Sequence, residues 1–264
     1  MKIALCYSGQ LGAFLKAFPS QKKSFIRDDM DIYAYTSNLI SQKNNSAPNY
    51  KPESKVYEYL PAGKGWRANL ESYGIIYQIG EKEIRNILSP ITKRMVKAVV
   101  EKEQIDDSLN DWNMSKWEWL KKRQLSKLYK SNQILKDSGI DYDLVVRSRF
   151  EFGPNIKIEI EKIFDDNKGD DNKIFLFGGW KCTPPMVFMD EFICDGFAFG
   201  TPKVMDIFSS LGLRDEPYPY NLKYKDCWDK FGDNVEHQFK SHLDANGIEV
   251  VHIGNSRGMY HLWR

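Results

Sequence analysis

The feature that most constrains the fold is a short apolar run that turns into alternating charges. The run at residues 144–146 predicts a buried strand, and Arg147, Arg149 and Glu151 follow at every second position. Because alternate side chains of a strand share one face, we expect the two guanidinium groups and the carboxylate in one row. A Gly-Pro dipeptide at residues 153–154 then ends the strand.

This row of charges has two interpretations. The carboxyl ends of strands are where open α/β sheets bind their ligands. Arginine forks bind phosphate oxygens, and a nearby carboxylate suits a hard divalent cation. The alternative is a set of structural Arg–Glu pairs, because surface ion pairs are common and weak.

The amino-terminal segment predicts a strand, a turn of small residues and a helix. An apolar run covers residues 3–7, the turn contains Ser8, Gly9 and Gln10, and residues 13–25 show helical spacing that a proline interrupts. Many nucleotide-binding α/β domains begin in this way. We expect the backbone amides of this turn to approach a phosphate or a base, although glycines also occur in such turns for geometry alone.

The later segments alternate between strands and helices. Further strands are predicted at residues 31–36, 73–79, 174–177 and 248–253. Helices are predicted at residues 81–88, 90–104, 115–138, 202–211 and 233–246. Residues 37–65, rich in Asn, Ser, Pro, Lys and Gly, are expected to form a mobile loop that acts as a lid.

This alternation predicts an α/β fold with a mainly parallel, mixed sheet flanked by helices. We expect one domain over residues 1–264. Its nucleotide-binding part is placed at about residues 1–152 and its acceptor or catalytic part at about residues 153–264.

Composition and missing motifs exclude several classes of protein. A formal net charge of +2 over 264 residues gives no electrostatic footprint for nucleic acid. No long apolar run is present, so we expect no transmembrane segment. The four cysteines lack the spacing of a zinc or redox pair, which favours a reducing compartment and a cytoplasmic protein. Without a nucleophile elbow, Walker loop or His-Glu-x-x-His motif, hydrolase and kinase functions lose support.

Three polar side chains in or beside apolar segments are candidates for chemistry. Asp195 lies in an apolar run and is a candidate general base, because burial raises the pKa of a carboxyl group toward the working pH. It is equally well explained as a turn aspartate before Gly196. Glu191 is the alternative base. Gln124 falls on the core-facing stripe of its predicted helix, so it needs either a structural hydrogen-bond partner or a ligand.

The last predicted strand and the turn after it carry two further candidates. His252 is a candidate metal ligand, because a carboxylate and an imidazole on separate strands are common partners for one divalent cation. Arg257 lies in a glycine-flanked turn and is a candidate for holding a diphosphate.

Four segments together are similar to a known family. They are residues 3–10 (IALCYSGQ), 31–36 (DIYAYT), 142–151 (YDLVVRSRFE) and 195–202 (DGFAFGTP). In this combination the chain resembles glycosyltransferases of the GT-A type that occur in microbial polysaccharide clusters and large viruses, including lipopolysaccharide-synthesis proteins of the WavE kind. The resemblance implies a single GT-A-like, Rossmann-like domain.

The chain departs from this family at one position. In such proteins the acid after the two arginines is usually aspartate and resembles the metal-binding Asp-x-Asp of other GT-A enzymes. Here that acid is Glu151, and its partner position holds Arg149. The tail His252-x-Gly254-x-x-Arg257 also resembles the His…Gly…Lys metal and diphosphate segment of glycogenin-like transferases. The resemblance thus implies a divalent cation, Mn²⁺ or Mg²⁺, on Glu151 and His252.

The reaction that the resemblance implies is transfer of a sugar from a nucleotide diphosphate sugar to a hydroxyl of a glycan acceptor. The turn at residues 8–10 would contact the nucleotide, and Arg147 and Arg149, or a metal on Glu151, would neutralise the departing diphosphate. Asp195 would orient the donor sugar or activate the acceptor hydroxyl. Two alternatives remain: a nucleotide-sugar-processing nucleotidyltransferase and a non-catalytic carbohydrate-binding protein.

Overall fold

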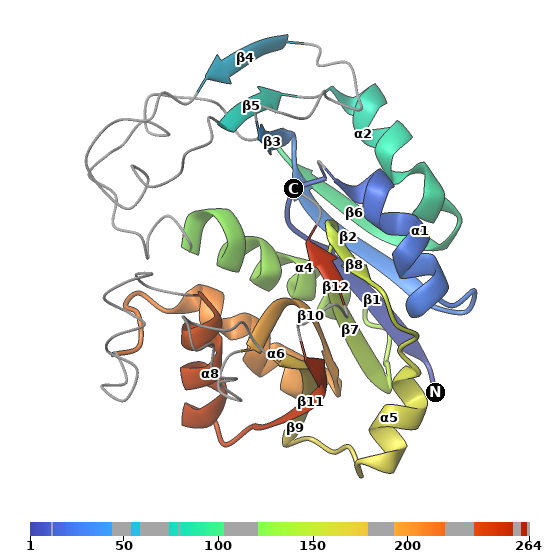
Figure 1. The fold of residues 1–264 in the computed structure, drawn as a ribbon, viewed down its shortest axis with the longest axis vertical. Helices are drawn as coiled ribbons and strands as arrows, with labels where there is room; N and C mark the ends of the chain where they lie inside the picture. Colours follow the sequence, from blue (N-terminus) through green and yellow to red (C-terminus); the bar gives the residue numbers. More distant parts are fainter. Residues whose placement is uncertain are drawn as a thin grey trace.

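The fold is organised around one large sheet. The computed structural model describes residues 1–11, 13–43, 54–58, 74–78, 80–102, 121–178, 193–219, 235–255 and 260–262. In these residues seven strands form a sheet in the order β11-β9-β10-β7-β1-β2-β6 (Figure 1). The strands are β1 (Ile3–Ser8), β2 (Asp31–Ser37), β6 (Met95–Glu101), β7 (Leu144–Arg149), β9 (Lys173–Gly178), β10 (Ile193–Gly200) and β11 (Glu249–Asn255).

The direction of the strands brings several chain segments to one edge of the sheet. All neighbouring strands are parallel except β10, which runs antiparallel to both β7 and β9. Ser8 at the end of β1 pairs with Arg149 at the end of β7. The amino end of β10 meets the same edge, because Phe197 pairs with Ser148. This topology confirms the predicted mixed, mainly parallel α/β sheet.

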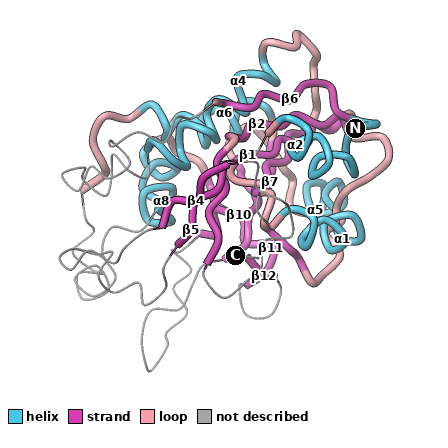
Figure 2. The backbone as a smooth tube through the Cα atoms, turned by 90° about the horizontal axis from the view of Figure 1, so that it is seen from above, coloured by secondary structure: helices cyan, strands magenta, loops and turns pink. Residues whose placement is uncertain are grey.

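Helices cover both faces of the sheet because the strands alternate their apolar side chains. Leu5 and Val146 pack on one face with Phe14 of α1, whereas Ala4 and Val145 pack on the other with residues of α4, α6 and α8. Figure 2 shows α1, α2 and α5 on one side of the strands and α4, α6 and α8 on the other. The helices are α1 (Phe14–Ser24), α2 (Glu81–Leu88), α4 (Ser126–Lys136), α5 (Ile160–Asp166), α6 (Pro202–Ser210) and α8 (Val235–Ala245).

An aromatic cluster fills the core behind the site. Phe197 of β10 is fully buried and stacks on Phe152, with ring centroids 5.4 Å apart. Its ring also contacts Phe25, Phe177 and Phe199. Offset and edge-to-face aromatic pairs contribute about 0.5–1.5 kcal/mol each beyond the area they bury. The cluster therefore holds β10 and the segment after β7 in fixed relative positions.

Helix ends follow the sequence signals closely. Thr201 caps α6 by accepting a hydrogen bond from the Val204 backbone N–H at 3.5 Å. Gly139 and Gly247 have φ values of 66° and 69°, and they end the helical segments before them as predicted. The segment at residues 121–125 is a π-helical turn that leads into α4.

No helix in the described part of the chain is long and apolar enough to cross a membrane.

Two predicted helices differ from the structure. Helix α1 continues through Pro19 rather than breaking there. Residues 90–104 were expected to be helical, but a 3₁₀ turn at Ser89–Arg94 leads into strand β6. Val96, Val99 and Val100 are β-branched, and pairing with β2 at the sheet edge decides in favour of the strand.

Part of the predicted lid loop is also ordered as strands. Within residues 37–65, β3 (Leu39–Lys43) and β4 (Ser54–Glu58) both pair with the predicted strand β5 (Gly74–Gln78). Ser37 ends β2 and Asn38 is buried, whereas residues 44–53 and 59–65 lie outside the described residues. A second small sheet pairs β8 (Phe152–Pro154) with β12 (Tyr260–Leu262), which the sequence did not predict (Figure 1).

Candidate functional site

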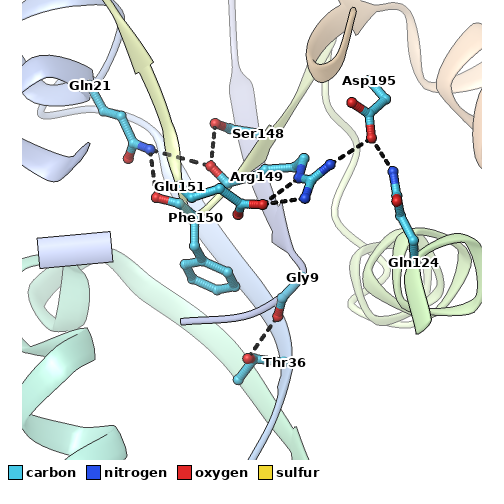
Figure 3. A network of polar contacts seen from close by, with 9 residues as sticks. All are labelled: Gly9, Gln21, Thr36, Gln124, Ser148, Arg149, Phe150, Glu151 and Asp195. Atoms are coloured by element: carbon cyan, nitrogen blue, oxygen red, sulfur yellow. Dashed lines mark hydrogen bonds and ion pairs between the residues drawn. The ribbon is translucent and has the colours of Figure 1, made fainter. Parts of the chain in front are cut away.

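The centre of the site is the guanidinium group of Arg149, which lies between two carboxylates. Its Nε donates to Glu151 Oε1 at 2.7 Å, and its Nη1 donates to Asp195 Oδ2 at 2.8 Å. Its Nη2 also contacts Glu151 Oε1. Figure 3 shows the arginine reaching from one carboxylate to the other. The two acids come from segments far apart in the sequence, and the sheet brings them to one edge.

This ion-pair group is largely buried. The side chains of Arg149, Glu151 and Asp195 are 21%, 13% and 4% exposed. Burial by itself would lower the pKa of Arg149, but the Coulombic attraction of Glu151 and then Asp195 outweighs it and raises that pKa above its ordinary value. Arg149 therefore carries a permanent positive charge at the edge of the sheet.

Glu151 reaches Arg149 through a turn rather than along a strand. Strand β7 ends at Arg149, so the predicted single row of Arg147, Arg149 and Glu151 is not a strand row. The turn at residues 150–151 folds the Glu151 carboxylate back onto the guanidinium. Arg147 shares its strand face with Arg149 but is only 2% exposed, within the layer that α4 covers.

Asp195 is held by two donors from different elements. Besides Arg149, the Gln124 Nε2 group of the π-helical turn donates to Asp195 Oδ2 (Figure 3). Asp195 lies in strand β10 and is 3% exposed, so it is not a turn aspartate. Of the two explanations for Gln124, the structure supplies the hydrogen-bond partner. Gln124 thereby fixes the carboxylate that faces Arg149.

The turn after β1 approaches the same charges. Gly9 has a φ of 118°, which only glycine adopts readily, and its carbonyl accepts from Thr36 Oγ1 at 2.8 Å. A Cβ placed at Gly9 would lie 3.9 Å from Glu151 Oε2. Among the described residues, neither Ser8 Oγ nor Glu151 Oε2 has a hydrogen-bond partner, although both atoms are buried. Gln10 follows half-buried.

A side chain that sequence reasoning missed holds the turn in place. Gln21 of α1 is fully buried, and its Nε2 lies 3.3 Å, 3.1 Å and 2.6 Å from the carbonyl oxygens of Arg149, Phe150 and Phe152. Its Oε1 accepts from Tyr7 OH at 2.7 Å. Gln21 falls on the apolar stripe that Phe14 begins, and a polar residue on such a stripe is the signal that identifies it.

The residues expected to bind a metal do not fit one shared ion. His252 lies on the edge strand β11, whereas Glu151 lies just after the end of β7. These two strands are three strand spacings apart, which is about 14 Å. Its ring packs beside Gly178 and not beside the carboxylates, since a Cβ at that glycine would meet His252 Nδ1 at 3.2 Å. Glu151 Oε1 is bound to Arg149. In the described ranges no three His, Cys, Asp or Glu side chains group as a metal site.

Two further candidate residues cannot be placed. Glu191, the alternative base, and Arg257, the candidate for the diphosphate, both lie outside the described residues. The structure therefore brings together Ser8, Gly9, Arg149, Glu151 and Asp195, and it keeps His252 apart.

Comparison with known proteins adds a structural similarity only. No protein-family model matches the sequence, and no curated protein is significantly similar to it. Among the solved structures that match is the apo form of mouse xyloside xylosyltransferase 1, with 7% sequence identity and a TM-score of 0.42. The match covers 95% of this chain and 83% of that one. At that identity and TM-score, the similarity assigns neither a family nor a reaction to the chain.

Proposed function

We propose that the protein is a glycosyltransferase that moves a sugar from a nucleotide diphosphate sugar to a hydroxyl of a glycan acceptor. The observation that carries the proposal is the buried cation of Arg149 at the carboxyl end of β7, beside the glycine turn that ends β1. A permanent positive charge at a strand end is suited to a diphosphate leaving group.

Arg149 retains donors for a ligand even though both carboxylates bind it. A guanidinium group has five N–H donors. Contacts to described residues use one on Nε, one on Nη1 and one on Nη2. The remaining two N–H groups belong to Nη1 and Nη2, and the side chain is 21% exposed. These donors support binding of phosphate oxygens, where charge develops as the sugar departs.

The neighbouring residues support matching roles. Ser8 and Gly9 are proposed to contact the nucleotide. Ser8 Oγ is buried without a hydrogen-bond partner among the described residues, and Gly9 places no side chain beside Glu151. Asp195, held by Gln124 and Arg149, is proposed to orient the donor sugar or to activate the acceptor hydroxyl. The polysaccharide pathway and the WavE kind belong to the same proposal and rest on the four similar sequence segments. The cytoplasmic location is also proposed, and it rests on the four cysteines, which lack the spacing of a zinc or redox pair.

The test is thermal unfolding with a panel of UDP-, GDP-, CMP- and dTDP-sugars, followed by a transfer assay with the sugar that binds. A ligand specific for the folded state adds about 2.7 kcal/mol of stability at a hundredfold excess over its Kd. We expect one donor to raise the Tm of the wild type and to leave the Tm of Arg149→Ala unchanged.

The matched control is Arg27→Ala. Arg27 also contacts two carboxylates, Asp29 and Glu161, but lies before β2 at the other end of the strands. This variant should keep the full donor shift. A well-folded wild type that no donor stabilises would contradict the proposal and favour a carbohydrate-binding protein. Conversion of the donor and pyrophosphate to a nucleoside triphosphate and a sugar 1-phosphate, without sugar transfer, would favour a nucleotide-sugar-processing nucleotidyltransferase.

A further inference from the structure

We propose that Arg149 takes the place of a divalent cation in this site, so that the protein binds its diphosphate donor without a metal. The identity of the donor rests on the proposed function, whereas the prediction about metal binding does not depend on it. It concerns the space between the Glu151 and Asp195 carboxylates, of which Glu151 was expected from the sequence to bind a metal.

The first argument is that the arginine already occupies the oxygens a cation would need. Two carboxylates from different segments converge, and the guanidinium bonds Oε1 of Glu151 at 2.7 Å and Oδ2 of Asp195 at 2.8 Å. A Mg²⁺ ion needs carboxylate oxygens at about 2.0–2.1 Å in near-octahedral geometry. An ion on the same two oxygens would have to displace the guanidinium.

The second argument is that such a displacement is unfavourable. The Arg149 and Asp195 side chains are only 21% and 4% exposed, so an expelled guanidinium would lose both carboxylates in a partly buried setting. Gln124 also donates to Asp195 Oδ2, and this N–H group would face an incoming cation. The surroundings of both acids are therefore built for hydrogen-bond donors.

The third argument concerns the remaining carboxylate oxygen. Glu151 Oε2 is buried beside Gly9 without a hydrogen-bond partner among the described residues. A single oxygen is a poor site for a divalent cation, which needs several oxygen ligands. It is a good acceptor for a ligand hydroxyl or N–H group that enters over the glycine. The site then offers one fixed cation for phosphate and one fixed acceptor for the rest of the donor.

The experiment measures manganese binding by electron paramagnetic resonance, with protein and Mn²⁺ alone and no donor. We expect the wild type to show no bound Mn²⁺ that depends on Glu151, so that wild type and Glu151→Gln give the same titration. Arg149→Ala, which removes the cation between the two carboxylates, should gain a Mn²⁺ site. Arg27→Ala, which removes the cation between Asp29 and Glu161 at the other end of the strands, should gain none.

Two results would overturn the proposal. One is a Mn²⁺ site in the wild type that Glu151→Gln removes, which can be measured even where Arg149→Ala does not fold. The other is a folded Arg149→Ala that binds no more Mn²⁺ than the wild type. Both are read without any nucleotide sugar, so failure of the proposed function leaves them interpretable.

A second measurement uses the donor once it has been identified. The donor Kd of the wild type in EDTA should agree within about twofold with its Kd in excess Mn²⁺. A tenfold difference in Kd would correspond to about 1.4 kcal/mol of binding free energy. In Arg149→Ala, donor binding should be lost in EDTA and partly recovered with Mn²⁺, because the ion then fills the vacated position. A loss of wild-type affinity of about tenfold or more in EDTA would refute the proposal while confirming that the donor binds.

Discussion

Arg149 shows how strongly the effect of one residue depends on its surroundings. It is held by two carboxylates at one edge of the sheet, and Arg27 is held by two carboxylates at the other. The two arrangements are chemically alike but differ in burial, since the Arg27 side chain is 35% exposed and its partner Asp29 is 62% exposed. Solvent screening weakens the exposed pair, whereas burial makes the loss of the cation costly for Glu151 and Asp195.

We therefore predict unequal costs for the two alanine variants. Arg149→Ala should lower the free energy of unfolding by about 3–5 kcal/mol, because it leaves Glu151 and Asp195 buried without this cation. Arg27→Ala should cost about 0–1 kcal/mol. Urea unfolding of both variants at neutral pH measures the difference. Equal costs would mean that the acids at the site are solvated and that the group is an ordinary surface cluster.

His242 predicts a pH dependence of stability. Its Nε2 donates to the Ile207 carbonyl at 2.8 Å, so its Nδ1 must accept from Tyr218 OH at 2.9 Å. Burial lowers the pKa of His242 from 6.5, the hydrogen bond to Ile207 partly opposes this, and Arg214, which stacks on Tyr218, lowers it further. The folded state thus favours the neutral imidazole.

The sign of the effect follows from this lowered pKa. The stabilising contribution is fully present above pH 6.5 and is lost as the pH falls from there through the lower folded-state pKa, since only the unfolded chain takes up the proton in that interval. Urea unfolding between about pH 7.5 and pH 5 should show His242→Gln losing less stability than the wild type. Parallel losses would assign the pH dependence to other groups.

At the scale of elements, sequence patterns predicted what local periodicity determines. Strands β1, β2, β7 and β11 and the ends of α4 and α8 follow from apolar runs and glycine stops. Strand β6 was mistaken for a helix because its valines pair with β2, and β12 was missed because its partner β8 lies far earlier in the chain. Pairing partners far along the chain leave no local trace in the sequence.

The candidate site was predictable to the same extent. The sequence marked Arg149, Glu151 and Asp195 as candidates, each in its own segment. It did not show that the Arg149 guanidinium binds both acids. The link depends on the antiparallel pairing of β10 with β7. Gln21 was missed for a related reason, since its three acceptors are backbone carbonyls 128, 129 and 131 residues away.

Helix α1 positions the turn that carries Glu151, and Gln21→Glu tests this. The variant loses both N–H donors and faces a carboxylate toward three carbonyl oxygens, so donor affinity should fall together with stability. The introduced carboxyl group can donate again only when it is protonated. Donor affinity of this variant should therefore recover as the pH is lowered, while that of the wild type should not.

The matched control for α1 is Ser24→Ala. Ser24 lies on the same helix and hydrogen-bonds the carbonyl of Ile156, beyond the turn and beyond β8. It should lose stability without losing donor affinity. Binding measured by calorimetry at several pH values separates the two variants. If Gln21→Glu binds the donor as the wild type does, α1 is only a structural support.

At the scale of the whole molecule, one continuous sheet joins the two halves of the chain: β7, β1, β2 and β6 form one side of it and β10, β9 and β11 the other. Strand β7, from the first half, is paired on one side with β1 and on the other with β10 from the second half. Phe152 stacks on Phe197 across the same division. The division at about residue 152, drawn from the sequence, is thus crossed by backbone hydrogen bonds and by the aromatic core.

We accordingly predict that a fragment of residues 1–152 will not fold alone. It would expose the edge of β7 and the apolar face that Phe197 and Phe199 cover, and such edges promote aggregation. Circular dichroism and light scattering of the fragment should show a loss of cooperative unfolding. Adding a fragment of residues 153–264 should restore it. A monomeric, cooperatively folded fragment would establish residues 1–152 as an independent unit.

The pairing of β1 with β7 also sets the order of events during refolding. Lys2 and Asp143, which hydrogen-bond beside this pair, are 141 residues apart, so the chain must close a very long loop before the two strands meet. Loop closure on this scale slows folding, because its entropy is lost before the contacts form. Local helices such as α4 should form within the early kinetic phases. The proposed donor site needs Ser8 and Arg149 side by side, so donor binding should return only with the slowest phase.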